Sequence, residues 1–234
     1  SSPEEYVVES VRLGHVALAI TDTLGVFAAV RLQQACIEHG LQPIIGTDLE
    51  INGAVVTVLA KDQIGYAEIC ELVTVLRTED DCEIYNRLSL LKRCILILHG
   101  LSAEREVVEE VLQKLPKKLM YVGIGHDGRP WARRRAGLIV EMAKVYSLPC
   151  VIAQDVRYAV RDRYATHDLM TCIRHGITIH EPHPLRPVND RHCLRSEDEL
   201  RAILPWPEAF EHVREIIQQC SFNIIPEHIT PPSA

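Results

Sequence analysis

Three aspartates lie at the ends of expected strands and are the first candidates for chemistry: Asp22, Asp48 and Asp155. In parallel sheets covered by helices, functional groups gather at the carboxyl ends of the strands. Carboxylates gathered at that edge would form a negatively charged candidate site. Acidic residues also cap the helices that follow strands, so a purely structural role remains equally open.

A glycine-rich segment, Gly123-Ile-Gly125-His-Asp-Gly128, matches the G-x-G-x-x-G pattern of dinucleotide-binding loops. It follows an expected strand and precedes an expected helix. The pattern requires the helix to begin within the glycines, so that its N-terminus faces a pyrophosphate. Here Arg129-Pro130-Trp131 places the helix start after the third glycine, and the strand is the fifth or sixth rather than the first. We therefore favour a structural role for this loop.

Residues 114–135 hold a basic stretch with seven cationic residues and one acid, a local charge of +6. Its densest part is Arg133-Arg134-Arg135, which could contact phosphate groups or an acidic partner. A solvated helix face is the simpler interpretation.

The eleven histidines and eight cysteines are many for a chain of this length. His180 and His183 stand three apart in an expected loop, but no spacing gives the paired motif of a zinc site, so solvated histidines are favoured. The chain has no Cys-x-x-Cys, and most cysteines fall in apolar periodic segments. These features indicate buried thiols in a reducing compartment.

The elements that must position these residues alternate between short apolar strands and helices. Strands are expected at 16–20, 43–45, 49–51, 54–59, 94–98, 119–124 and 150–153. Helices are expected at 26–38, 66–77, 104–115, 131–146, 163–175, 196–204 and 207–220. Residues 78–93 and 176–193 read as irregular. This order predicts an α/β fold with a mostly parallel sheet whose outer face is covered by helices.

Two local signals in the first sixty residues are strong. Ser2, Pro3 and Glu5 form the signature of a capped helix that begins the chain. A chain that opens in this way, without an initiator Met, is expected to be cut from a longer protein. Asn52-Gly53 predicts a type I′ hairpin turn, because both central positions need positive φ. We expect this hairpin to lie outside the parallel strands.

Length and composition exclude several classes of protein. The 234 residues, 47% of them hydrophobic, are enough for a self-sufficient core and too apolar for a disordered chain. The net charge of −7 and the aromatic content of 5% argue against a general nucleic-acid-binding surface. The apolar runs are strand-sized, so no membrane span is expected. Residues 1–12 carry three glutamates and no signal-peptide core, and we expect a cytoplasmic protein.

Several segments, taken in order, resemble the PHP (polymerase and histidinol phosphatase) domain of the alpha subunit of bacterial DNA polymerase III and of its error-prone relatives. The resemblance runs from about residue 1 to 224. The segments are Ala17–Val30, Gly40–Asp48, Leu59–Tyr66, Leu148–Tyr158, His167–Gly176 and Arg191–Glu199.

The resemblance implies a distorted, seven-stranded, TIM-like β/α barrel at residues 1–160 whose first strand is missing from this chain. A helical lead-in to a polymerase palm would follow at 161–226, and a loose tail at 227–234. Family members that keep their metal cluster are phosphoesterases or proofreading 3′–5′ exonucleases that hold two or three divalent ions.

The chain departs from the family pattern at nearly every implied metal ligand. The first-strand His-x-His would lie before Ser1, Asp22 is followed by Thr23 where the family has His, and Thr57 or a neighbour replaces another His. Asp48 replaces a Glu, and Arg157 replaces the His of the motif that begins at Asp155. A guanidinium cannot bind a metal ion, but it supplies positive charge at such a position and could pair with Asp155 or Asp22.

These departures favour a degenerate PHP module without catalytic residues or bound metal, in which Asp22, Asp48 and Asp155 are vestigial ligand positions. The parent enzyme would be a DNA-directed DNA polymerase in replication, repair or translesion synthesis. Expected partners are its polymerase core, a proofreading exonuclease subunit and, indirectly, DNA. The alternative is an active phosphoesterase or exonuclease that binds Zn²⁺ or Mn²⁺ through the three aspartates and His99.

Overall fold

The computed structural model describes residues 1–79, 83–100 and 104–225, and the expected loose tail at 227–234 lies outside them. Its strands are β1 (Ala17–Thr23), β2 (Gln42–Ile51), β3 (Ala54–Ala60), β4 (Cys94–His99), β5 (Met120–Ile124) and β6 (Cys150–Ile152). Its α-helices are α1 (Pro3–Arg12), α2 (Ala29–His39), α3 (Gln63–Thr78), α4 (Ile84–Leu90), α5 (Arg105–Lys114), α6 (Ala132–Val145), α7 (Tyr164–His175), α8 (Glu197–Ile203) and α9 (Pro207–Gln219). Short 3₁₀ turns, η1 (Lys117–Leu119) and η2 (Arg161–Arg163), complete the list.

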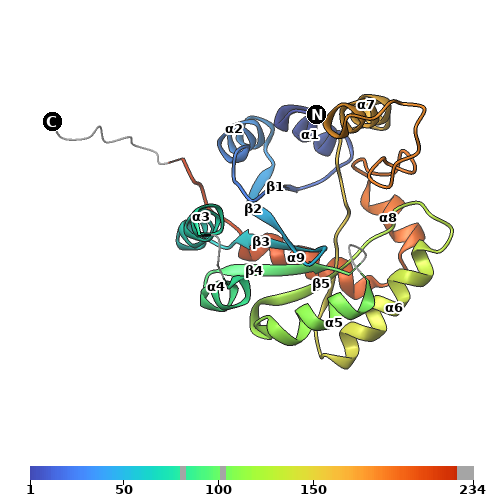
Figure 1. Ribbon diagram of the computed structural model, residues 1–234. Coiled ribbons are helices and arrows are strands. Elements are labelled where there is room, and N and C mark those ends of the chain that lie inside the picture. Colours follow the sequence, from blue (N-terminus) through green and yellow to red (C-terminus); the bar gives the residue numbers. More distant parts are fainter. Residues whose placement is uncertain (80–82, 101–103, 226–234) are drawn as a thin grey trace.

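The strands form one six-stranded sheet in the order of the chain, β1 to β6. The sheet curls into a half-barrel with most of the helices around its outside (Figure 1). The expected α/β class is therefore confirmed, with six described strands. The prediction of irregular structure at 78–93 is wrong in part, because the short helix α4 buries Leu88 in the main core.

The hairpin at Asn52-Gly53 forms as predicted, but its position in the sheet is not the expected one. β3 runs antiparallel to both β2 and β4, so the hairpin lies at the centre of the sheet rather than outside the parallel strands. The reason is burial: five consecutive residues of β3, from Val56 to Ala60, are shielded from solvent, and the position between β2 and β4 covers both edges of the strand.

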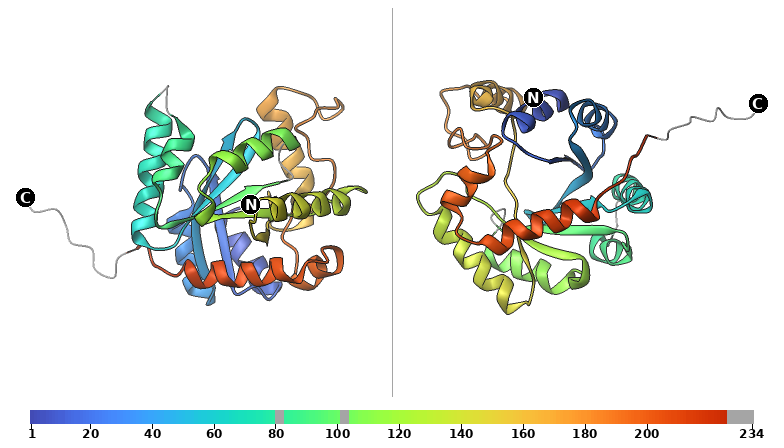
Figure 2. Two further views of the ribbon diagram at one scale, coloured as in Figure 1. Left: turned by 90° about the horizontal axis from the view of Figure 1, so that it is seen from below. Right: turned by 180° about the vertical axis from the view of Figure 1, so that it is seen from behind.

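The inner face of the half-barrel is divided into an apolar end and a polar end. Helix α9 packs its Ile216 against the apolar end, near the starts of β2 and β4, where Ile44 and Ile95 lie. The amide of Gln42 fixes the end of α9 by donating to the carbonyl oxygens of Ile217 and of Cys220, the residue that follows the helix. Figure 2 shows α9 running across this end of the curled sheet. The opposite, polar end contains the candidate site.

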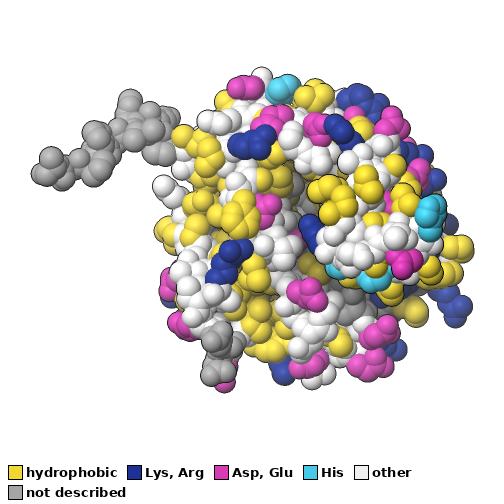
Figure 3. All heavy atoms as spheres, turned by 45° about the horizontal axis from the view of Figure 1, so that its top comes forward, with side chains coloured by type: hydrophobic (Ala, Val, Ile, Leu, Met, Phe, Trp, Pro, Cys, Tyr) yellow, Lys and Arg dark blue, Asp and Glu magenta, His cyan; other side chains and the backbone are white. Residues whose placement is uncertain are grey.

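Helix α7 and the loop at 176–193 form a lobe beside the sheet, which we call the α7 lobe. Arg186 holds it together: its guanidinium donates to both carboxylate oxygens of Asp168, at 2.8 and 2.6 Å, and to the carbonyls of Ile179 and Glu181. The hydrogen bond from Arg186 holds the pKa of Asp168 below its ordinary value. Figure 3 shows histidine side chains on this lobe among hydrophobic and charged ones.

We expect Gly53→Val to lower the free energy of unfolding by about 1–2 kcal/mol. Gly53 has φ 87° and Asn52 has φ 52°, so a β-branched residue would be forced into the left-handed region. No atom lies within 4 Å of a Cβ built on Gly53, so the loss would come from the backbone alone. Urea denaturation measures it. Gly53→Asn is the control, because Asn tolerates this conformation, and equal stability of the two variants would contradict the assignment.

Candidate functional site

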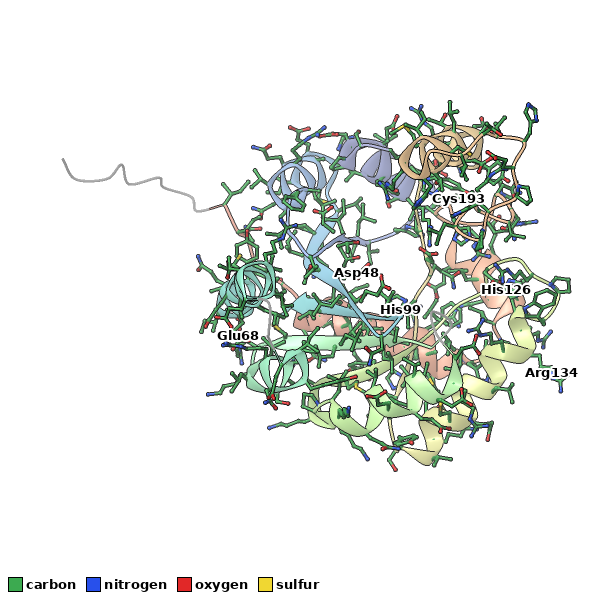
Figure 4. All side chains as sticks on the ribbon, in the orientation of Figure 1. Asp48, Glu68, His99, His126, Arg134 and Cys193 are labelled. Carbon is green, nitrogen blue, oxygen red and sulfur yellow. The ribbon has the colours of Figure 1, made fainter. Side chains whose placement is uncertain are left out.

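The candidate site lies at the polar end of the inner face, which we call the barrel mouth. The sheet register aligns Asp48 of β2 with Thr57 of β3, and Thr57 with Ile97 of β4, two residues before His99. Because side chains alternate between the faces of a strand, Asp48, Thr57 and His99 share the inner face. Figure 4 shows Asp48 and His99 inside the curl, whereas Glu68 and Arg134 lie outside it.

A chain of hydrogen bonds joins these three side chains. The hydroxyl oxygen of Thr57 lies 2.5 Å from Asp48 Oδ1 and 2.8 Å from His99 Nε2. Burial raises the pKa of Asp48 although hydrogen bonding to Thr57 opposes this, and burial lowers the pKa of His99. Both shifts reduce the charge of the barrel mouth.

Asp155 lies in a second polar group with Arg157 and His192. The Arg157 guanidinium donates to both carboxylate oxygens of Asp155, at 3.0 and 3.1 Å, and His192 Nδ1 lies 3.2 Å from Asp155 Oδ2. Burial alone would raise the pKa of Asp155, but hydrogen bonds from His192 and Arg157 outweigh it and hold the pKa well below its ordinary value. Asp155 therefore stays ionised at neutral pH and is unsuited to donate a proton.

Asp22 does not join the other two aspartates. Its register partner is Thr47, which places it on the outer face of the sheet. There its carboxylate accepts a hydrogen bond from the backbone N–H of Ala28, at 2.8 Å, where α2 begins. This contact to Ala28, the N-cap residue of α2, is a structural role of the kind that the sequence left open for Asp22. Arg157 pairs with Asp155, one of its two expected partners.

The donor set does not fit the two-ion site that the resemblance implies. Of the four ligands considered from the sequence, Asp22 points away and Asp155 is paired with a cation, which leaves Asp48 and His99. Within the described residues, no group of three or more His, Cys, Asp or Glu side chains has a metal-binding arrangement. We therefore derive no metal-dependent step from this site.

The glycine loop between β5 and α6 is explained by packing. A Cβ on Gly125 would lie 2.5 Å from the carbonyl oxygen of Ala153, and Gly128 has φ 82° in a turn. Helix α6 begins at Ala132, after the last glycine of the loop. A dinucleotide-binding loop would need the helix to begin within the glycines.

The arginines of the basic stretch lie in the first turn of α6. Arg133 and Arg134 are exposed, whereas Arg135 is half-buried and has a partner within the chain. The first turn holds no acidic residue, so these cations add to the positive end of the helix dipole. Figure 4 shows Arg134 of this group on the outside of the barrel, away from Asp48 and His99.

Sequence reasoning did not find two residues near the site. His192 contacts Asp155 from 37 positions away. Arg195 is 7% exposed, and its guanidinium donates to the carbonyl of His126 at 2.6 Å and to the side chain of Gln154. No local pattern marks either residue, because the segment that carries them reaches the barrel mouth only through the tertiary fold.

The sequence of the chain is similar to a known domain family and to known enzymes. A family model for the PHP domain matches residues 1–99. The chain is 31% identical to an error-prone DNA polymerase from Pseudomonas syringae pv. syringae over 96% of its length, and 27% identical to one from Symbiobacterium thermophilum over 93%. It spans about 23% of the length of each.

Among solved structures, an amidohydrolase from Chromobacterium violaceum aligns with a TM-score of 0.47 and 8% identity, over 66% of this chain and 81% of that one. This structural similarity is too weak to support a conclusion about the chain. The sequence similarities are the stronger support. Residues 1–99 therefore match the model of the PHP domain family, and the chain as a whole is similar to part of the error-prone DNA polymerases.

Proposed function

We propose that this chain is a degenerate, non-catalytic PHP module of a bacterial DNA-directed DNA polymerase, serving replication, repair or translesion synthesis in the cytoplasm. The observation that carries the proposal is the ion pair between Arg157 and Asp155. It occupies a carboxylate that an active centre would need for metal, with a cation that cannot be a ligand. The similarity to polymerases over nearly the whole chain supports the choice of parent enzyme.

The module would act as a structural support. The barrel at 1–160 would be one strand short of seven, and a further strand would find free backbone edges at β1 and β6, which each have one neighbour in the described sheet. The segment at 161–226 would lead into the polymerase palm. Within the described residues, no helix combines the length and apolarity needed to cross a membrane.

Partners follow from the same proposal. The principal partner is the polymerase core, since the relatives are more than four times as long as the aligned region. A proofreading exonuclease subunit would dock on the module and supply the hydrolytic activity that the barrel mouth lacks. The first turn of α6, with Arg133, Arg134 and Arg135, would contact the phosphates of DNA held by the core, or an acidic partner surface.

We expect the chelator-treated chain to bind Zn²⁺ or Mn²⁺ no more tightly than an ordinary acidic surface, and to hydrolyse no bis-p-nitrophenyl phosphate. The reason is the number of ligands: two ions need several convergent carboxylates and imidazoles, and here Asp48 and His99 remain. Arg157→His alone should restore neither binding nor turnover. Calorimetric titration and release of p-nitrophenol measure the two properties.

The competing function is an active metal-dependent phosphoesterase or 3′–5′ exonuclease. It requires that Asp155 release Arg157 and join Asp48 and His99 around Zn²⁺ or Mn²⁺. Micromolar binding of two ions, together with turnover that Asp155→Asn abolishes, would establish this function and refute the non-catalytic one.

A further inference from the structure

Thr57 lies between Asp48 and His99, the two of the four candidate ligands that neither point away from the barrel mouth nor pair with a cation. Its hydroxyl contacts Asp48 on one neighbouring strand and His99 on the other, so a single side chain bridges β2, β3 and β4. The residue is 5% exposed, so water has little access to compete for these hydrogen bonds.

The positions of the protons in the bridge determine whether Nε2 of His99 can bind a metal ion. A hydroxyl has one hydrogen, so Thr57 donates to one neighbour and accepts from the other. If it donates to Asp48, His99 must carry a hydrogen on Nε2 in order to donate in turn. If it donates to Nε2, Asp48 must be protonated. In both arrangements Nε2 has no lone pair left for a metal ion.

The same geometry argues against a reactive hydroxyl. A nucleophilic threonine needs access to a substrate as well as a base that removes its proton. The Thr57 hydroxyl is buried, and both of its neighbours already use it. The two hydrogen bonds of the Thr57 hydroxyl therefore have a structural role.

We infer that Thr57 is the residue that keeps the barrel mouth free of metal, and that its hydrogen bonds replace a bound ion as the link between β2, β3 and β4. This inference rests on the proposed non-catalytic function and adds the residue responsible. The register of β2, β3 and β4 places Asp48 and His99 on either side of position 57, so a ligand at that position would complete a three-ligand site.

The first experiment adds that ligand. Thr57→Cys keeps the size of the side chain and supplies a thiolate, which with Asp48 and His99 gives the three ligands of an open zinc-type site. Titration with Co²⁺, followed by the visible absorption of thiolate-bound cobalt, should show a gain in affinity on the order of 100-fold over the wild type. Thr57→Val releases Nε2 of His99 but adds no ligand, so its gain should be far smaller than that of Thr57→Cys. Adding His99→Gln to Thr57→Cys should remove the gain.

The second experiment tests the link between strands without metal. Thr57→Val leaves both Asp48 and His99 without the hydroxyl, and Tm in the presence of chelator should fall by about 5 °C. Thr57→Ser retains the hydroxyl and is the matched control, with a smaller fall.

The outcomes separate this inference from the function on which it rests. Wild-type binding of Co²⁺ that Asp48→Asn abolishes would overturn the proposed non-catalytic function. If the wild type binds no Co²⁺ but folded Thr57→Cys also gains none, the assignment to Thr57 alone is wrong. A Tm for Thr57→Val equal to that of Thr57→Ser would likewise overturn the structural link.

Discussion

Replacing Arg186 by Met should lower Tm by about 10 °C, a larger loss than any other single substitution considered for this chain. The change removes the cation and keeps the volume, so the carboxylate of Asp168 stays buried without a partner. The carbonyls of Ile179 and Glu181 lose their donor as well, and the loop of the α7 lobe loses its anchor. Thermal unfolding followed by circular dichroism measures the loss.

The double variant Asp168→Asn/Arg186→Met should recover part of this loss, because it leaves no uncompensated charge. Lys144→Met breaks the exposed ion pair with Glu141 and serves as the control, with a change in Tm of about 1 °C or less. If Arg186→Met melts like Lys144→Met, the anchoring role of Arg186 is wrong.

The same ion pair predicts the direction of a pH effect. Arg186 holds the pKa of Asp168 below its ordinary value, so the carboxylate takes up its proton more readily in the unfolded chain. The stabilisation is therefore complete above the unfolded pKa of about 3.9 and is lost as pH falls through the lower folded pKa. The difference in Tm between the wild type and the double variant should be constant near neutral pH and shrink below about pH 4.

Reversing two charges on α6, Arg133→Glu together with Arg134→Glu, should weaken DNA binding by the polymerase that we propose contains this chain. Each phosphate contact contributes about 0.9 to the slope of log affinity against log salt concentration, so losing two should reduce the slope by about 1.8. Fluorescence anisotropy with labelled primer–template DNA at several salt concentrations measures both affinity and slope.

Arg105→Glu is the control for a general charge effect, because Arg105 is an exposed arginine on α5 that pairs with Glu109 of the same helix. Its salt slope should stay that of the wild type. An unchanged slope in the double reversal would assign Arg133 and Arg134 to a solvated helix face and leave DNA contact to the rest of the polymerase.

Much of the local structure was predictable because the signals act within a few residues. The capping box at Ser2 and Glu5 forms with both of its hydrogen bonds, and Gly40 and Gly176 end their helices in the left-handed conformation. Ser196 caps α8 as its spacing with Glu199 indicates. Backbone dihedral preferences and side-chain reach decide these features, and both can be read from neighbouring residues.

The candidate site was only partly predictable, because its parts come from distant segments. The sequence identified Asp48, Asp155 and Arg157, and it left open whether Arg157 would pair with Asp155 or Asp22. It did not predict that Thr57 bridges Asp48 and His99, since that depends on the antiparallel register of β3. The inward or outward direction of a side chain reverses with every residue of register, so small uncertainties in pairing change the members of a site.

The sequence by itself determined most of the strands and helices and where most of them end, and it showed that the chain departs from the family pattern at the implied metal ligands. It missed α4, and it divided the single strand β2 into two. Only the tertiary structure decided that β3 enters the centre of the sheet, that Asp22 faces a helix instead of the barrel mouth, and that His192 joins Asp155. The physical reason is the range of the interactions. Capping and turn formation are settled within one turn of chain, whereas the members of the barrel mouth are brought together by strand pairing and by the burial of β3.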